Sequence, residues 1–473
     1  MTETDTDLLI IGAGPGGYVA AIRAAQKGLD VTLVERSAYG GTCLNTGCIP
    51  SKAYITATDI AHEAENAEIM GISANPEVDL STMCEWKNGV VDQLTGGVEK
   101  LCKANGVNLI EATARFVDDQ TAEIDRGNNN GDESTERTFD HAIIATGSRP
   151  SQIPGFDFSD GAVWSSTDAL AAETVPDRLV VVGGGYIGME LSTVFAKLGT
   201  EVTVIEMLDD ILPTYGSDVT RIVRSRAEEL GIEFQFGEGA SGWEPVDEGG
   251  EIVVTSETED GEQSSYEAEQ VMVAVGRTPV TDTLNLDNAG IDTDDRGIIP
   301  TDDRMRTNVE HIFAVGDVAG DPMLAHAASK EGIVAAEVAA GEPAALDVQA
   351  VPAAVFTDPE VATVGMTEGE AKEAGFDPVV GEMPFRASGR ALTIGETDGF
   401  VTIVADEETG FVLGGKIVGP EASELIAEIT LAIELGATLE DIGSTVHTHP
   451  TLAEAVMEAA ENAEGQAIHT LNR

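Results

Sequence analysis

Two stretches of this chain repeat one order of apolar and polar positions. The first has a short apolar run at Leu8–Ile11, a glycine-rich turn at Gly12–Gly17, an alanine-rich segment at Tyr18–Lys27 and a second apolar run at Val31–Val34. Short apolar runs bounded by turn residues are typical of buried strands, and a longer alanine-rich segment is typical of a helix. This pattern predicts a strand–helix–strand unit.

The second stretch, about 170 residues later, has the same organisation. Apolar runs at Leu179–Val182 and Val202–Ile205 flank a glycine-rich turn at Gly183–Gly188 and a helical segment at Met189–Lys197. The rest of the chain reads as a helical region over residues 54–104, further short apolar runs, and a part from about Val351 in which strands precede helices. We therefore expect an α/β protein with two Rossmann-like domains and an α+β C-terminal domain.

The charge shows in which environment this fold has to work. The chain carries 84 acidic against 26 basic residues, a net charge of −58, and only 5% aromatic residues. Long acidic chains with few aromatics are usually disordered, but the regular apolar runs indicate a folded protein with an acidic surface. Because salt screens such self-repulsion, we interpret the charge as adaptation to a salt-filled cytoplasm, as in extreme halophiles, rather than as that of an ordinary acidic protein. It also argues against nucleic acid or anionic membranes as partners.

The N-terminal residues Met1–Asp7 are polar and acidic and show no signal peptide. No apolar run reaches the ~20 residues that cross a bilayer. The four cysteines of this long chain imply no disulfide framework. We expect a soluble, cytoplasmic protein.

Each glycine turn has the spacing of a dinucleotide-binding fingerprint. The first is Gly12-Ala-Gly14-Pro-Gly-Gly17 and the second is Gly183-Gly-Gly185-Tyr-Ile-Gly188, and in both an acidic residue, Glu35 or Glu206, follows 23 positions after the first glycine. The first glycine allows a tight turn, the second lets the backbone approach a pyrophosphate at the helix N-terminus, and the third lets helix pack on strand. A lone motif of this kind can be merely a tight turn, but here strand, helix and acid recur twice.

Glu206 also bears on the choice of nucleotide. A carboxylate at this position accepts from a free ribose 2′-hydroxyl and repels a 2′-phosphate, and no basic residue lies among Met207–Pro213. The second fingerprint therefore favours NAD over NADP.

A pair of cysteines follows the first unit, in Gly40-Gly-Thr-Cys43-Leu-Asn-Thr-Gly-Cys48-Ile-Pro-Ser-Lys52. Two cysteines five positions apart can bridge if the local turn allows it, and a close pair in the cytosol is more often catalytic or metal-binding than structural. No further Cys or His stands at ligand spacing, so we expect no metal site. The alternative is two unrelated buried thiols. Cys84 and Cys102 lie in the helical region and are expected to be inert.

This segment resembles the redox motif of the pyridine nucleotide–disulfide oxidoreductases, and is most similar to the branch of that family that oxidises dihydrolipoamide. The resemblance covers nearly the whole chain, and its motifs include Ala145-Thr-Gly147, Gly276-Arg277, Gly316-Asp317, Met323-Leu-Ala-His326 and His447-Thr-His449-Pro-Thr-Leu-Ala-Glu454. It implies an FAD-binding domain over residues 1–150 and 276–350, an NAD-binding domain over 151–275 and a dimerisation domain over 351–473.

The resemblance also implies cofactor contacts. For FAD these are Gly12, Gly14, Gly17, Glu35, Arg36, Gly41, Thr42, Lys52, Ala114, Thr146, Gly147, Asp317, Met323, Leu324 and Ala325. For NAD they are Gly183, Gly185, Tyr186, Ile187, Gly188, Glu190, Glu206 and Gly276. Asp317 would hold the ribityl–phosphate part of FAD, and Met323–Ala325 would back the isoalloxazine ring.

The implied catalytic residues are Cys43, Cys48, Lys52, Glu190, His449 and Glu454. Cys43 would exchange with the substrate and Cys48 would face the flavin, while Lys52 would pair with Glu190. His449, contributed by the partner subunit of a homodimer, would be the acid–base residue, oriented by Glu454. His447 could compete for that role, and His326 is expected to be structural.

The resulting expectation is oxidation of dihydrolipoyl groups with NAD, on a lipoyl-carrying protein of a 2-oxoacid dehydrogenase or glycine cleavage system. The nearest alternative is a related NAD(P)H-dependent reductase of glutathione or another low-molecular-weight disulfide. Mercuric reductase is disfavoured because the chain ends in His469–Arg473 without a second cysteine pair, and a disulfide-free NADH oxidase because both redox cysteines are present. A structural subunit of a multienzyme complex is the alternative from outside the enzymes.

Overall fold

The structure is a computed structural model that describes residues 5–126, 134–246 and 250–472. The chain divides into two compact units, each built from two separate stretches. Unit 1 consists of Met1–Val175 and Met272–Asp347, and unit 2 of Pro176–Val271 and Val348–Arg473.

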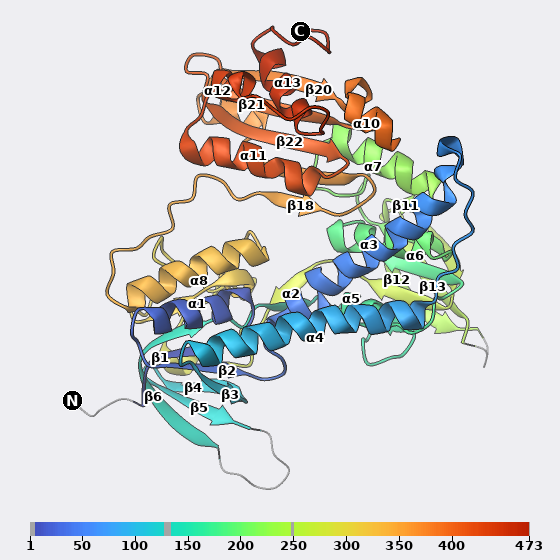
Figure 1. Cartoon of the computed structure of the whole chain (residues 1–473). Helices are drawn as coiled ribbons and strands as arrows, with labels where there is room; N and C mark the ends of the chain where they lie inside the picture. The colour runs from blue at the N-terminus through green and yellow to red at the C-terminus, as the bar shows by residue number, and fades with distance from the viewer. Residues whose placement is uncertain (1–4, 127–133, 247–249, 473) are drawn as a thin grey trace. The chain divides into compact units, whose positions relative to one another are not determined.

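Unit 1 is built on a sheet whose parallel part runs in the order β3-β2-β1-β6-β17. Two helices, α1 and α8, lie side by side on one face of this sheet (Figure 1). The antiparallel strands β4 and β5 extend it beyond β6. The bounds are β1 Thr6–Ile11, α1 Pro15–Gln26, β2 Val31–Glu35, β3 Asn108–Glu111, β4 Thr113–Asp118, β5 Thr121–Asp125, β6 Thr135–Ile144, β17 Ile312–Ala314 and α8 Ala325–Ala339.

Strand β1 shows why its sequence is a continuous apolar run. Successive side chains of a strand point to opposite faces of the sheet. Leu8 and Ile10 accordingly join the core under α1 and α8, whereas Leu9 and Ile11 join the core on the opposite face. Both faces are covered, as is usual for a parallel sheet, so no polar position interrupts the strand.

The remaining elements of unit 1 are mostly helical and follow the first strand–helix–strand unit. The predicted helical region consists of two helices, α3 and α4, separated by the short helix η1 and an extended stretch. The bounds are α2 Gly41–Thr46, α3 Cys48–Glu65, η1 Ala67–Met70, α4 Leu80–Ala104, β7 Ser148–Pro150, β8 Val163–Trp164, α5 Ser166–Ala171, β16 Arg277–Pro279, η2 Leu286–Ala289 and η3 Gly316–Val318.

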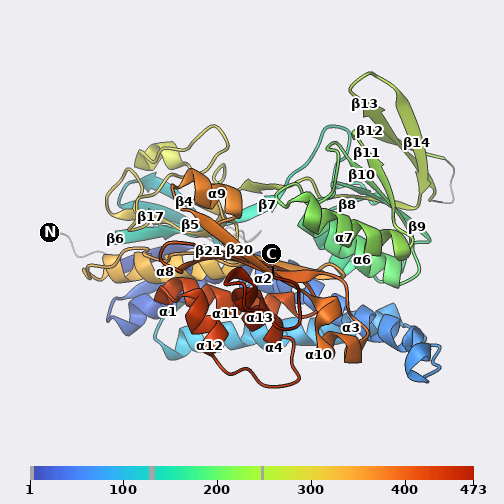
Figure 2. The ribbon, with the colours of Figure 1, turned by 90° about the horizontal axis from the view of Figure 1, so that it is seen from above.

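The first half of unit 2 repeats the parallel strand–helix–strand arrangement, in the strand order β11-β10-β9-β15. A separate antiparallel sheet, β12-β13-β14, lies beside it (Figure 2). The bounds are β9 Arg178–Val182, α6 Tyr186–Lys197, β10 Glu201–Glu206, α7 Ser217–Glu229, β11 Glu233–Phe236, β12 Glu238–Pro245, β13 Ile252–Thr258, β14 Gln263–Ala268 and β15 Gln270–Val273.

The second half of unit 2 is an antiparallel sheet in the order β18-β19-β22-β21-β20. Helix α11 packs on β22, and α13 packs so closely on β20 that a Cβ at Gly381 would lie 1.9 Å from the Ala459 carbonyl oxygen (Figure 1). The bounds are β18 Ala353–Val355, β19 Glu360–Gly365, α9 Glu368–Glu373, β20 Pro378–Pro384, η4 Phe385–Ala387, α10 Gly389–Ile394, β21 Phe400–Asp406, β22 Val412–Gly419, α11 Ala422–Leu435, α12 Leu439–Ser444 and α13 Glu454–Ala463.

The expected fold class is confirmed, including both strand–helix–strand units and the α+β C-terminal part. The helices α1 and α6 both begin three residues earlier than predicted, at Pro15 and Tyr186. In α1 the reason is local, because a proline has no N–H to lose in the first helical turn and its fixed φ suits a helix. Among the described residues, none of the helices has the length and apolar character needed to cross a bilayer.

Candidate active site

The two cysteines lie where one short helix ends and a long one begins. Cys43 lies in α2 and Cys48 begins α3, after Gly47 has turned the backbone out of the helical path. Both are free thiols, and their side chains are hydrogen-bonded to each other. That contact, followed by burial, raises the pKa of the Cys43 thiol, while the charge of Lys52 opposes the rise. Sulfurs in contact are what a disulfide requires.

Helix α2, which carries Cys43, begins beside the first glycine turn. The N–H of Gly40 donates to the carbonyl oxygen of Ala13 at 2.8 Å. Gly41 has φ +59°, and a Cβ there would lie only 2.6 Å from the Cα of Gly14. Any side chain at Gly41 would therefore push α2, and with it Cys43, away from the first fingerprint. Thr42 follows as an exposed residue of α2.

The two fingerprints have matching geometry. Gly12 and Gly183 have φ values of +101° and +106°, in the region that favours glycine. A Cβ at the third glycine would lie 1.9 Å from the Gly12 carbonyl oxygen at Gly17, and 2.0 Å from the Gly183 oxygen at Gly188. Each helix therefore depends on a missing side chain in order to pack on its strand.

The second glycine of each fingerprint faces open space. A Cβ at Gly14 would find no atom nearer than 4.0 Å, and one at Gly185 would find none within 4 Å. Both are the N-caps of their helices, with no side-chain cap on the helix N–H groups. Room for a close approach beside free helical N–H groups is what a pyrophosphate requires, so these residues fit the dinucleotides expected there.

The acidic residues of the two units also make matching contacts. Glu35 accepts hydrogen bonds from the N–H of Ala13 at 2.7 Å and of Ser37 at 3.0 Å. Glu206 accepts from the N–H of Gly184 at 2.7 Å and of Leu208 at 2.9 Å. Each carboxylate is thus fixed beside its own glycine turn, where a ribose would lie. Arg36, next to Glu35, is exposed.

Asp317 lies at the centre of a polar cluster in unit 1. Its carboxylate accepts a short hydrogen bond from the Ser148 hydroxyl and lies 3.7 Å from the Arg277 guanidinium. Arg277 also donates to the Ser148 hydroxyl at 2.7 Å. On the backbone side, the N–H of Gly316 donates to Glu331 at 2.6 Å.

The other residues expected near FAD are spread over unit 1. Ala114 is buried in β4. Thr146 donates to the Val280 carbonyl oxygen at 2.7 Å, and Gly147 next to it has φ +65°. Met323–Ala325 form the partly buried entry to α8. Gly276, expected near NAD, has φ +131°.

In unit 2, the helix of the second fingerprint is tied to the segment that follows β18. Tyr186 and Ile187 begin the helix, and Tyr186 is exposed. Glu190 is 4% exposed, and its Oε1 accepts from the N–H of Phe356 at 2.9 Å. The expected pairing of Glu190 with Lys52 joins residues of the two units and stays a prediction.

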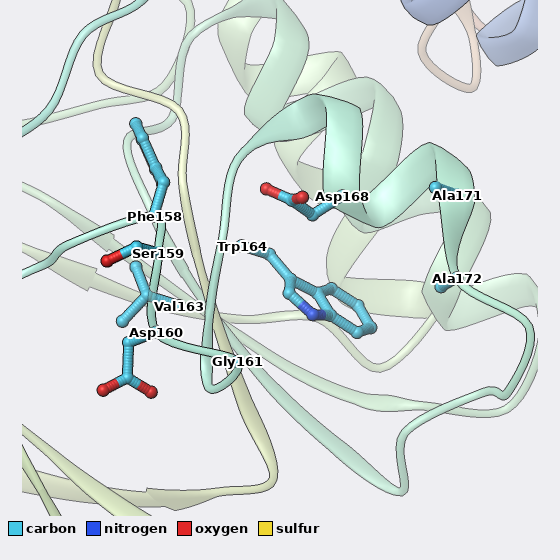
Figure 3. A pocket seen from close by; sticks show the side chains of 9 residues that line it. All are labelled: Phe158, Ser159, Asp160, Gly161, Val163, Trp164, Asp168, Ala171 and Ala172. Atoms are coloured by element: carbon cyan, nitrogen blue, oxygen red, sulfur yellow. The ribbon is translucent and has the colours of Figure 1, made fainter. Parts of the chain in front are cut away.

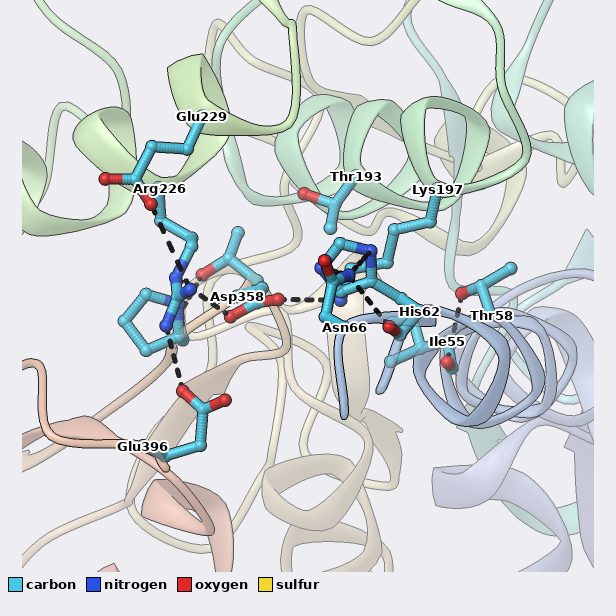
Figure 4. Close-up of polar contacts among 12 residues, drawn as sticks. Ile55, Thr58, His62, Asn66, Thr193, Lys197, Arg226, Glu229, Asp358 and Glu396 are labelled. Carbon is cyan, nitrogen blue, oxygen red and sulfur yellow. Dashed lines mark hydrogen bonds and ion pairs between the residues drawn. The ribbon is translucent and has the colours of Figure 1, made fainter. Parts of the chain in front are cut away.

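The far end of the same helix is held by charge. Lys197, whose side chain is 3% exposed, lies 2.7 Å from Asp358. Arg226 of α7 lies 3.7 Å from the other oxygen of Asp358 and 2.9 Å from Glu396 (Figure 4). Helix α6 is therefore anchored to residues 356–358 both near its start and at its end.

His449 and Glu454 form a dyad at the beginning of α13. The Nδ1 of His449 lies 2.9 Å from Glu454 Oε1, and the other carboxylate oxygen accepts from the N–H of Thr451 at 2.8 Å. Burial acts to raise the pKa of Glu454, but the hydrogen bonds from Thr451 and His449 outweigh it and the pKa lies below its usual value. The His449 side chain is 79% exposed, and its Nε2 makes no hydrogen bond to the described residues.

His447 has a different environment. Its side chain is 7% exposed, with Nε2 lying 2.7 Å from Glu428 and Nδ1 lying 2.8 Å from the Thr445 carbonyl oxygen. Both ring nitrogens are occupied, so His447 has no atom free to take a proton from a substrate. The geometry therefore favours His449 as the base.

A surface cavity of about 310 Å³ lies next to α5, apart from all predicted site residues (Figure 3). Trp164 and Asp168 face it from one side, and Phe158 and Ser159 from the other. One oxygen of Asp168 already binds the Ser165 N–H and hydroxyl as the capping box of α5. Among the described residues, no three His, Cys, Asp or Glu side chains gather as a metal ion would require.

Sequence reasoning missed several residues that hold the predicted ones. Ser148 holds Asp317, Phe356 holds Glu190, and Glu331 holds the turn before Asp317. Ser148 directly follows the Ala-Thr-Gly motif, and that position could have suggested it. The other two come from distant segments with no local pattern to mark them.

Comparison with known proteins gives whole-chain matches. The family model of the pyridine nucleotide-disulphide oxidoreductases matches residues 6–332, and the model of that family's dimerisation domain matches residues 351–460. Two relatives named dihydrolipoyl dehydrogenase come from Haloferax volcanii, at 72% identity over 99% of this chain and 98% of theirs, and from Halobacterium salinarum, at 66% over 100% and 99%. A third, from Bacillus subtilis, is 49% identical over 98% of both chains.

Solved structures agree with these matches. LpdA from Mycobacterium tuberculosis is 27% identical, with a TM-score of 0.88 over 96% of this chain and 99% of that one. The flavoprotein disulfide reductase RclA from Escherichia coli is 26% identical, with a TM-score of 0.85 over 96% and 99%.

Proposed function

The chain belongs to the pyridine nucleotide-disulphide oxidoreductase family, and from this premise we infer that it is a flavoprotein that oxidises dihydrolipoamide with FAD and NAD as cofactors. The observation that carries this function is the contact between the thiols of Cys43 and Cys48 beside the first fingerprint. Relatives from halophilic archaea support the interpretation of the surface charge as a salt adaptation.

We propose that FAD occupies the first fingerprint and NAD the second. Gly12–Gly17 and Glu35 would hold the FAD adenosine and pyrophosphate, and Asp317 the ribityl–phosphate part. Gly183–Gly188 and Glu206 would hold NAD. The open second glycines and the fixed carboxylates support this assignment.

The acid–base step belongs to His449 in our proposal. The substrate thiol must lose its proton before it can attack a disulfide. The Nε2 of His449 takes that proton, while Glu454 at Nδ1 fixes the tautomer and stabilises the positive charge that develops on the ring. We propose, on the family resemblance, that the partner subunit contributes this histidine to each site.

Thiol–disulfide exchange then follows on the cysteine pair. The substrate thiolate attacks the Cys43 sulfur of the oxidised pair, and Cys48 leaves as a thiolate. The second substrate thiolate attacks the sulfur bonded to Cys43, which closes the lipoyl disulfide and leaves both cysteines reduced. Cys48 is the more exposed of the two, so exposure alone does not order the sulfurs, and their order rests on the resemblance. When bound, FAD supplies an acceptor for the electron pair of the reduced cysteines, and NAD carries it away as hydride.

The dimerisation-domain match supports a homodimer. We propose that this dimer acts in the cytoplasm on the lipoyl-carrying protein of a 2-oxoacid dehydrogenase or glycine cleavage system.

The division of the chain into four parts at residues 150, 275 and 350 also stays a proposal. The compact units change after Val175, Val271 and Asp347, so the last two changes lie within four residues of the proposed boundaries and the first lies 25 residues later.

An anaerobic titration tests the function. Dihydrolipoamide is added to the holoenzyme at high salt while the flavin spectrum is followed, and NAD is then added while NADH is measured. We expect a long-wavelength thiolate-to-flavin band, NADH formation, and loss of the band in Cys48→Ser. Greater turnover with glutathione than with lipoamide would favour the related reductase, and no turnover with either would favour a structural subunit.

A further inference from the structure

The backbone N–H of Gly316, directly before Asp317, is buried and needs a hydrogen-bond acceptor. The residue has φ +74° and begins the short helix η3 that carries Asp317. Its N–H donates to Oε2 of Glu331, fifteen positions later in α8, at 2.6 Å. A buried N–H that loses its acceptor is costly, because no water replaces the lost bond.

Glu331 reaches this turn at the point where two helices cross. A Cβ at Gly332 would lie 2.3 Å from the Gly16 carbonyl oxygen of α1, and a Cβ at Gly316 would lie 3.1 Å from Cβ of Ala328. Burial raises the pKa of the Glu331 carboxyl, and the hydrogen bond from Gly316 opposes the rise. Glu331 is thus partly buried beside the turn, at the point where α8 packs on α1.

The two anchors of the turn act on different parts of it. Ser148 and Arg277 hold the Asp317 side chain, whereas Glu331 holds the backbone one residue earlier. The second oxygen of Glu331 makes no hydrogen bond to the described residues. Its one contact therefore serves the turn alone.

We propose that Glu331 is a positioning residue for FAD, which fixes the backbone at Gly316 and so directs the Asp317 carboxylate toward the ribityl–phosphate part of the cofactor. This inference rests on the proposed function for the location of FAD. It assigns a role to a residue of α8 that is not among the predicted site residues.

The test is the affinity of apoprotein for FAD, measured at high salt by quenching of flavin fluorescence. Glu331→Ala should raise the Kd for FAD about tenfold, because it removes the acceptor of a hydrogen bond to a charged group. Glu331→Gln keeps a carbonyl acceptor and should stay within about threefold of the parent protein. Should Glu331→Ala not fold, Glu331→Asp, whose carboxylate reaches one methylene less far, replaces it with the same expectation.

Glu337 provides the matched control. It lies on the same helix and also ties α8 to α1, at 3.7 Å from both Arg23 and Lys27, but it does not contact the turn. Glu337→Ala should leave the Kd for FAD unchanged. An equal rise of the Kd in both alanine variants would mean that Glu331 only holds the helices together, and would overturn the proposal.

A double-mutant cycle with Asp317→Asn tests the route of the effect. If Glu331 acts through Asp317, removing both groups should weaken FAD binding less than the product of the two single effects. Independent effects would contradict a positioning role. The readout is FAD binding alone, so an enzyme that binds FAD but does not oxidise dihydrolipoamide would refute the proposed function and leave this inference standing.

Discussion

Two histidines, two positions apart, show how the environment of one residue decides its use. His447 has both ring nitrogens engaged by Glu428 and Thr445, whereas His449 has one nitrogen oriented by Glu454 and the other without a hydrogen bond to the described residues. The same residue type is therefore structural at one position and suited to proton transfer at the other. The local partners Thr445 and Glu454 lie within five positions of their histidines, whereas Glu428, which occupies His447, comes from α11.

The first prediction compares these two histidines. His449→Gln should lower kcat for dihydrolipoamide oxidation about 100- to 10,000-fold, because it removes the base. His447→Gln should leave kcat within about threefold and lower the thermal midpoint instead, because it breaks a buried contact with Glu428. Steady-state assays and thermal unfolding on both variants measure this, and a reversed order of the kcat values would move the base to His447.

A third histidine, His141 in β6, gives a prediction about pH. Its ring packs near Phe313, its Nδ1 is buried without a hydrogen bond, and burial, together with the charge of His311, lowers its pKa. In the unfolded chain the imidazole has a pKa of about 6.5 and binds a proton more readily than in the folded protein. As the pH falls below about 6.5, this proton uptake favours the unfolded state, so the protein loses stability. Leucine takes up no proton in either state. The urea midpoint of His141→Leu, relative to that of the parent protein, should therefore be higher at about pH 5 than at about pH 8.

His469 is the control, because its pKa shift has the opposite sign. The hydrogen bond to Glu458 raises the pKa of His469, so its contribution is present at low pH and is lost as the pH rises through that raised pKa. His469→Gln should therefore cost stability at low pH and little at high pH. The same pH trend in both variants would show that the acid response comes from the overall charge.

At the scale of elements, α6 is held at two points by a segment that follows 161 to 166 residues later in the chain. Phe356 and Asp358 bind Glu190 and Lys197, which lie seven positions, or two helical turns, apart on one face of the helix. The N-terminus of this helix is the proposed pyrophosphate site. The position of α6 in unit 2 therefore depends on residues from the second half of that unit.

The corresponding prediction concerns Asp358. Asp358→Asn removes the negative charge that lies 2.7 Å from Lys197, whose side chain is 3% exposed, and should cost about 3–5 kcal/mol of unfolding free energy. Asp398→Asn is the matched control, because Asp398 lies 3.8 Å from Arg226 with 61% of its side chain exposed, and it should cost less than about 1 kcal/mol. Urea unfolding at constant salt distinguishes them, and equal costs would show that the pair at Lys197 is not buried in solution.

At the scale of the whole molecule, the net charge of −58 dominates. Salt at about 1 M shortens the Debye length to about 3 Å, against about 10 Å at 0.1 M, and so screens the repulsion between surface carboxylates. We predict cooperative unfolding as KCl is lowered from a few molar to about 0.1 M, followed by circular dichroism. Sucrose screens no charge and should not replace the salt, and full rescue by sucrose would contradict the electrostatic cause.

The chain order and the spatial order agree in some parts of this protein and not in others. The glycine turns, their helices and the acidic residues 23 positions later were predictable, because φ, close packing and a short strand–helix–strand unit act within about thirty residues. Which segments of the chain come together in each compact unit was not predictable in this way. The two segments of unit 1 are separated by the 96 residues 176–271, and those of unit 2 by the 76 residues 272–347.

The sequence by itself determined the fold class, the two nucleotide fingerprints and the cysteine pair, because each is encoded by patterns within short stretches of the chain. Only the tertiary structure decided that Glu428 occupies His447, which carboxylate holds the turn before Asp317, and what anchors α6. Those decisions are made by hydrogen bonds and ion pairs that join distant segments. No local motif marks the side chains that take part in such contacts.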